Sequence, residues 1–206
     1  MMNGKLIMLS GIDGSGKSSL ALTLQKMLHD SCGQHSVIVD AMKSGHYAEQ
    51  LKKMVNSGAE LRRSFSPELL NLTWTADLLY NFRSTIQPFL ENGHWVITHR
   101  SDLCCRVYSK MFAAHDEISQ HLLDSLDLPS HWNFFLEIAP ESAFSRICLR
   151  NRDKVLETKE QLAYLNRADE IYRQFLQTNR YSGAIVLNAE RPIQELAEEV
   201  LRYLDK

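Results

Sequence analysis

Short apolar runs recur along the chain and are separated by longer segments with helical periodicity. The runs are rich in Val, Ile, Leu and Phe and do not alternate strictly, which is typical of strands buried on both faces of a parallel sheet. They predict strands over residues 5–9, 36–39, 95–98, 132–138 and 184–187. Helical patterns occupy residues 17–30, 47–56, 67–91, 102–113, 117–126, 141–151, 159–178 and 192–204.

This alternation of strands and helices predicts an α/β fold, a five-stranded parallel sheet covered by helices on both faces. Ligands bind to such sheets at the carboxyl ends of the strands. Pro88 predicts an irregular last turn in the helix over 67–91, and Gly93 is placed to end it. Because no repeat, low-complexity tract or linker interrupts the chain, we interpret residues 1–206 as one domain.

Composition narrows the class of protein. The chain has 44% hydrophobic residues and a net charge of −2 with neutral histidines, which does not fit a general nucleic-acid binder with its basic excess. The apolar stretch at 6–9 is too short for a signal peptide, and no window approaches the roughly 20 apolar residues of a membrane span. We therefore expect a cytoplasmic protein that binds neither nucleic acid nor membrane.

The cysteines do not change this expectation. Their spacing fits neither a zinc site nor a disulfide framework, so we interpret them as reduced thiols. They are Cys32, Cys104, Cys105 and Cys148.

The loop after the first predicted strand carries the clearest chemical motif. Residues 11–18 read Gly-Ile-Asp-Gly-Ser-Gly-Lys-Ser and match the P-loop pattern G-x-x-x-x-G-K-[ST] between a strand and a helix. Glycines let the backbone N–H groups turn toward phosphate oxygens, and the following helix adds its positive end. Lys17 is placed to contact the β- and γ-phosphates, and Ser18 to ligate Mg²⁺. The predicted ATP site comprises Gly11, Gly14, Ser15, Gly16, Lys17, Ser18 and Ser19.

Beyond the loop, the order of features resembles the thymidylate kinase family over nearly the whole chain. Ser10 to Ser19 is similar to that family's loop, G-x-D-G-x-G-K-[ST]-[ST]. Residues 68–77, 86–90 and 93–97 resemble its long central helix and next strand, and residues 141–150 the helix before its lid. The resemblance implies a three-layer P-loop fold and transfer of the ATP γ-phosphoryl group to a nucleoside monophosphate, nominally dTMP. It also implies a homodimer packed through helices.

The resemblance also implies roles for single residues. Trp74 stands where the family stacks an aromatic ring on the acceptor base, and Arg100 where an arginine holds the acceptor phosphate. A guanidinium suits this task because its planar fork binds two oxygens. Asp13 would lie near the acceptor sugar. The acceptor site as the resemblance implies it comprises Asp13, Trp74, Arg100, Tyr80, Lys43 and Tyr108.

The donor side follows the family design that carries its catalytic arginines in the lid. Gly14 and Ser15 leave no arginine in the P-loop, whereas Arg150 and Arg152 fall in a predicted lid at about residues 150–158. Positive charge at the γ-phosphoryl oxygens is the main need of phosphoryl transfer. We therefore assign catalytic roles to Lys17, Arg150, Arg152 and Asp13, and adenine-side roles to Arg146 and Arg191.

Three acceptor-side segments depart from the family. The family's Asp-Arg pair reads His99-Arg100, so the aspartate expected near Mg²⁺ is missing, and Asp102 is a candidate replacement. Histidine is a poor ligand for Mg²⁺, which prefers oxygen. Leu78 stands where the family has an arginine, and Tyr80 where it often has a polar base-reading residue. After the second strand, Lys43 is the one obvious cation in place of the family's arginine-containing loop.

Three functions are compatible with these features. The first is an ATP:nucleoside-monophosphate kinase, favoured by Arg100. The second is a kinase of a neutral hydroxyl or other small metabolite, such as a nucleoside, and it is favoured by the loss of arginine at Leu78. It needs a base, for which Asp13, Asp102 or His99 are candidates. The third is a P-loop ATPase or nucleotide-responsive regulator without a small acceptor.

Overall fold

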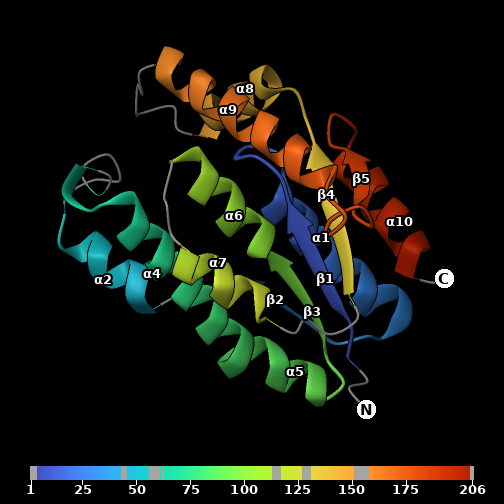
Figure 1. Cartoon of the computed structure of the whole chain (residues 1–206). Coiled ribbons are helices and arrows are strands. Elements are labelled where there is room, and N and C mark those ends of the chain that lie inside the picture. Colours follow the sequence, from blue (N-terminus) through green and yellow to red (C-terminus); the bar gives the residue numbers. More distant parts are fainter. Residues whose placement is uncertain are drawn as a thin grey trace.

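The parallel sheet is formed by five strands in the order β2-β3-β1-β4-β5, as the computed structural model shows (Figure 1). The structure describes residues 4–42, 46–55, 61, 63–112, 117–126, 131–150 and 158–204. The strands begin and end within one residue of the predicted ranges, and they are β1 Leu6–Ser10, β2 Ser36–Asp40, β3 Trp95–His99, β4 His131–Glu137 and β5 Ile185–Asn188. The predicted α/β fold is confirmed.

The centre of the sheet explains its apolar sequence. All residues of β1 are buried, because β3 and β4 flank it and helices cover both of its faces. In β3, Val96 and Ile97 are likewise inaccessible to solvent. A strand covered on both sides has no solvent face, so its side chains do not alternate between apolar and polar.

Helices form a layer on each face of the sheet. α1 (Lys17–Cys32) packs against α10 (Ile193–Leu204) on one face, whereas α6 (Asp102–Met111) packs against α9 (Thr158–Leu176) and α4 (Pro67–Asn81) on the other. In Figure 1, α6 lies in front of the sheet with α7 beside α4. The remaining helices are α2 (His46–Lys53), α5 (Gln87–Glu91), α7 (Glu117–Asp124) and α8 (Pro140–Arg150). No helix within the described ranges is both long and apolar enough to span a bilayer.

The segment predicted as one helix over 67–91 is divided. It begins regularly, since the Ser66 side chain accepts a hydrogen bond from the N–H of Leu69 at 3.3 Å. Between α4 and α5 lies a π-helical turn, η1 (Phe82–Ile86), in which the N–H of Gln87 donates to the carbonyl of Phe82. Pro88 cannot donate a hydrogen bond, and its ring crowds the preceding turn, so the irregularity falls just before it.

The strand order sets the position of the site. Because all five strands are parallel, their carboxyl ends meet at one edge of the sheet. There His99 is the register partner of Asp40 on β2 and of Leu9 on β1. The loop after β1 and the ends of β2 and β3 therefore form neighbouring walls of any ligand site.

Candidate active site

The P-loop at the end of β1 has a backbone that its glycines make possible. Gly14 and Gly16 have φ angles of 86° and 101°, which side-chain-bearing residues rarely adopt. A Cβ atom on Gly14 would lie 2.4 Å from the carbonyl oxygen of Ala143 in α8. Gly14 therefore lets α8 approach the loop closely as well as allowing the turn.

Helix α1 starts directly from this loop. Gly16 is its N-cap, and the first turn contains no acidic residue, so the exposed backbone N–H groups present an uncompensated positive end. The buried Lys17 ammonium lies over the loop, where Nζ donates to the carbonyls of Gly11 at 2.9 Å and Ile12 at 2.8 Å. Backbone N–H groups and an ammonium so placed form a site for phosphate oxygens.

A cleft of about 350 Å³ opens beside the loop, and we call it the phosphate cleft. It joins the P-loop to the ends of β2 and β3 and to α8 and α9. Its lining residues are Asp13, Gly14, Gly16, Lys17, Ser18, Asp40, His99, Arg100, Ile147, Arg150 and Gln161. Seven of the predicted site residues, Gly14 included, thus line one cavity. Cations from the P-loop, from the residue after β3 and from α8 line the same space.

Arg100 is the most constrained residue of the cleft. Its φ angle is 89°, the one positive value among the described residues other than glycine. Its guanidinium donates to Asp13 Oδ1 at 3.2 Å and to the Tyr108 hydroxyl at 3.4 Å. An unfavourable backbone conformation at a buried cation that lines a cleft is typical of a binding residue.

The charge state of Arg100 follows from its surroundings. Burial by itself would lower the pKa of Arg100, but the oxygens of Tyr108 and Asp13 raise it well above its ordinary value. Burial, together with the Asp13 carboxylate, also raises the pKa of the Tyr108 phenol. Arg100 therefore carries its charge, and Tyr108 stays neutral, at every pH where an enzyme works.

An aromatic cluster continues from Arg100 into the helical layer. The Arg100 guanidinium carbon lies 5.8 Å from the Tyr108 ring centroid. The Trp74 ring of α4 lies 6.2 Å from Tyr108 and 6.4 Å from Phe112, and Phe112 lies 6.4 Å from Tyr164 of α9. Trp74 is only partly buried, so part of a large ring is available beside the arginine.

A comparison of the chain with known protein families identifies the family to which it belongs. The family model described as thymidylate kinase matches residues 9–200. The chain belongs to the thymidylate kinase family. It is therefore a kinase, with a P-loop that binds the nucleoside triphosphate donor, and the family resemblance inferred from the sequence is confirmed.

Curated thymidylate kinases match the chain over nearly its whole length. The protein named thymidylate kinase of Blochmanniella floridana is 29% identical, with 100% of this chain and 97% of the relative covered. That of Buchnera aphidicola subsp. Baizongia pistaciae is 28% identical over 95% and 92%. A probable thymidylate kinase of Pyrobaculum calidifontis is 28% identical over 97% and 95%.

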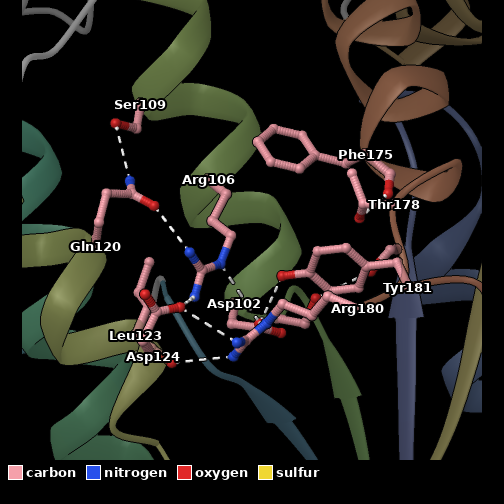
Figure 2. A network of polar contacts seen from close by, with 12 residues as sticks. Asp102, Arg106, Ser109, Gln120, Leu123, Asp124, Phe175, Thr178, Arg180 and Tyr181 are labelled. Carbon is pink, nitrogen blue, oxygen red and sulfur yellow. Dashed lines mark hydrogen bonds and ion pairs between the residues drawn. The ribbon is translucent and has the colours of Figure 1, made fainter.

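Asp102, suggested by the sequence as the replacement for the thymidylate kinase family's missing aspartate, does not line the phosphate cleft. It belongs to the network of polar contacts drawn in Figure 2. Its buried carboxylate accepts a 2.6 Å hydrogen bond from the Tyr181 hydroxyl. It also lies 3.5 Å from Arg180 Nε and 3.8 Å from Arg106 Nε. All three contacts are to Oδ2, and Asp102 is not among the residues that line the phosphate cleft, which argues against the magnesium-ligand role. Asp102 instead joins α6 to the segment after α9.

The carboxylate that does lie at the cleft beside His99 is Asp40, which the sequence analysis overlooked. Asp40 Oδ2 is 3.5 Å from His99 Nδ1, and both side chains are 18% exposed. Asp40 ends β2, so the rule that ligands bind at the carboxyl ends of parallel strands was the signal that could have found it. Ile147 and Gln161 also line the cleft without having been predicted.

Of the described donor-side residues that follow the P-loop, one lines the phosphate cleft and three do not. Arg150, the last residue of α8, lines the phosphate cleft. Arg146 Nη2 donates to the carbonyl of Ala189 at 2.9 Å, in the turn after β5. Arg191 in that turn is paired with Glu199 and, at 3.1 Å, with Glu195 on α10. Ser19 is exposed on the first turn of α1.

The altered acceptor positions on α4 lie outside the phosphate cleft. Leu78 is 4% exposed and belongs to the hydrophobic core, so no cation stands in the place where the family has an arginine. Tyr80 is exposed, with its ring edge-on to Tyr47 at 6.5 Å. The predicted contributions of Lys43 and Arg152 lie outside the described residues.

Proposed function

We propose that this kinase transfers the γ-phosphoryl group of ATP to dTMP and releases dTDP and ADP. The observation that carries the proposal is the joint lining of one cleft by the P-loop Lys17 and by Arg100. The first is suited to the donor phosphates and the second, a planar fork at a strand end, to the acceptor phosphate. The family match supports dTMP as the acceptor.

The transfer needs no general base. An oxygen of the acceptor phosphate forms the new bond to the γ-phosphorus, while the bond from that phosphorus to the β–γ bridging oxygen breaks. The residues contribute position and charge: Lys17 and Arg150 stabilise charge on the transferring group, and Arg100, oriented by Asp13, holds the acceptor. Trp74 and Tyr108 would hold the base side of the acceptor against the aromatic cluster.

The residues of the cleft fit a magnesium ion that takes most of its ligands from ATP and water. Ser18 is exposed at the cleft and offers a hydroxyl oxygen, the kind of ligand that Mg²⁺ prefers. No cluster of three His, Cys, Asp or Glu side chains within the described ranges forms a metal site. When bound with ATP, the ion would neutralise charge on the phosphates.

The remaining parts of the proposal concern the lid, the assembly and the location of the protein. Residues 150–158 connect α8 to α9, and we assign the lid to them because Arg150 at their start already lines the cleft. Residues 151–157 lie outside the described part of the chain. A homodimer stays a prediction from the family resemblance, and a cytoplasmic location stays a prediction from the apolar pattern of the sequence.

The proposal is tested with Mg-ATP and a panel of nucleoside monophosphates and nucleosides, by following ADP release and the mass gain of one phosphoryl group. We expect dTMP to react fastest and thymidine not to react. The buried Leu78 favours a second candidate, a neutral hydroxyl acceptor. Phosphorylation of thymidine with unreacted dTMP would select this second candidate, and ADP release without any phosphorylated acceptor would contradict both.

A further inference from the structure

We propose that protonated His99, held by Asp40, is a second cation for the acceptor phosphate and makes acceptor affinity depend on pH. The inference rests on the proposed transfer to a nucleoside monophosphate. It assigns a specificity-determining role to a pair that neither the sequence pattern nor the family match assigns.

The pair lies where the two phosphates must meet. His99 directly precedes Arg100, the residue assigned to the acceptor phosphate, and lines the same cleft as Lys17 on the donor side. His99 and Asp40 are register partners on adjacent strands, so the sheet itself sets their separation. A residue on a central strand end is held more rigidly than one on a loop, and a rigid cation binds phosphate without a large loss of side-chain entropy.

The Asp40 carboxylate lies beside the imidazole, with Oδ2 at 3.5 Å from Nδ1 of His99. In the protonated ring both nitrogens are donors, and we assign the Nε2–H to the acceptor phosphate. A carboxylate near one ring nitrogen stabilises the imidazolium, and a phosphate oxygen bound at the other nitrogen would stabilise it in the same way.

The charges around the cleft show why a second cation matters. The charged groups that line the cleft together with His99 are Asp40 on β2, Asp13 and Lys17 of the P-loop, Arg150 at the end of α8, and Arg100. Arg100 shares its charge with Asp13 at 3.2 Å, and Lys17 is assigned to the donor. In place of the family's further arginine stands the buried Leu78. Among the cleft residues that the structure describes, the cation assigned to the acceptor dianion is therefore the partly neutralised Arg100, and a charged His99 adds a second one.

In this chain a histidine stands where the family resemblance places an aspartate, and this difference strengthens the attraction of the acceptor phosphate. An aspartate at position 99 would repel the acceptor, whereas an imidazolium attracts it, so the exchange changes the local charge by two units when His99 is protonated. Phosphate binding favours the protonated form, because opposite charges stabilise each other. Affinity for the dianion is thus high at low pH and falls as the pH rises through the titration of His99.

The experiment measures dTMP binding by calorimetry, and the KM for dTMP, from pH 6.5 to pH 9. In this range the acceptor phosphate, with its second pKa of about 6, is mostly a dianion. We expect the wild-type affinity to fall by about tenfold or more across the range. His99→Asn should bind weakly with a flat profile, and His99→Lys should bind tightly with a flat profile. His94→Asn, at the opposite end of β3, should keep the wild-type slope.

Asp40→Asn separates this role from a purely structural one. Without the carboxylate the imidazolium is less stable, so the fall in affinity should move to lower pH, with nearly unchanged limiting values. A structural role instead predicts equal losses at every pH. A flat wild-type profile, or a His99→Asn variant that keeps the slope, would overturn the proposal. So would a kcat that rises with pH and depends on His99 while KM does not change, because that indicates a base.

The two proposals fail in distinguishable ways. Normal phosphorylation of dTMP at pH 7 with no dependence on His99 would overturn the role of His99 and leave the proposed function intact. Absence of dTMP phosphorylation at every pH, in folded enzyme that still binds ATP, would overturn the proposed function itself.

Discussion

The donor and acceptor sides of the phosphate cleft are built in different ways. The donor side comes from one continuous stretch, residues 11–18, with glycine backbone angles and a helix start encoded next to one another. The proposed acceptor side is assembled from the ends of β2 and β3 and from helices α4 and α6. Asp40 and Arg100 lie at the same edge although 59 intervening residues separate them in the sequence.

This difference explains where the chain departs from its family. A continuous loop works as a unit, and an exchange such as Gly14 to a larger residue meets both an unfavourable φ and the α8 backbone at 2.4 Å. Residues contributed by separate elements can change one at a time, as Leu78 and His99 do. A substitution at Gly14 therefore meets backbone constraints that a substitution at a single acceptor-side position such as His99 does not meet.

The largest effect on stability is expected at Asp102. This residue is two positions after Arg100 in the sequence, but its buried carboxylate belongs to the polar network of Figure 2. Asp102→Ala leaves Arg106 and the Tyr181 hydroxyl without their buried partner, and it should lower the free energy of unfolding by about 3–5 kcal/mol. Chemical denaturation measures this change. Asp124→Ala, at a 59% exposed carboxylate of the same network, is the milder control. A stable Asp102→Ala variant with altered Mg²⁺ dependence would restore the metal-ligand role.

The donor side should be most sensitive at Lys17. Lys17→Ala removes the cation nearest the P-loop carbonyls and should lower kcat about a hundredfold or more, a barrier rise of roughly 3 kcal/mol. Steady-state kinetics at saturating acceptor measure it. Lys26→Ala, an exposed lysine on the same helix, should be without effect. Near-normal turnover of Lys17→Ala would contradict the donor-side assignment.

On the acceptor side, Arg100→Ala should act mainly on KM. We expect the KM for dTMP to rise by about tenfold to a hundredfold, because the bidentate donor to the acceptor phosphate is lost. The KM for ATP should change little, which separates the two sides of the cleft. Arg83→Ala, at an exposed arginine of η1, is the control. A rise in the KM for ATP alone would assign Arg100 to the donor instead.

The smallest effect is expected at Trp74. Trp74→Phe keeps an aromatic face but removes part of the ring surface beside Tyr108, and should raise the KM for dTMP by less than about fivefold, or below ~1 kcal/mol. Trp132→Phe, whose ring lies 5.1 Å from Lys5 and outside the cleft, should leave KM unchanged. Equal effects of the two exchanges on KM would argue against stacking by Trp74.

Much of the fold was predictable from local patterns. Apolar runs without alternation identified the strands, because burial on both faces removes the requirement for polar positions. The division of the helix over 67–91 was partly predictable, since Pro88 indicates irregular structure nearby. That the irregularity is a π-turn at Phe82–Ile86 depends on how α4 and α5 pack, which local sequence does not encode.

By itself, the sequence determined the P-loop and hence the phosphate donor, because every residue of that site is adjacent to the next and its conformation depends on local backbone preferences. Only the tertiary structure decided which of two carboxylates, Asp40 or Asp102, lies at the phosphate cleft. Asp102 faces Arg180 and Tyr181, more than 70 residues further along, and is used in the core, whereas Asp40 reaches the cleft because β2 pairs with β3. A carboxylate binds whichever partner the fold brings within a few ångströms, and sequence spacing does not reveal that partner.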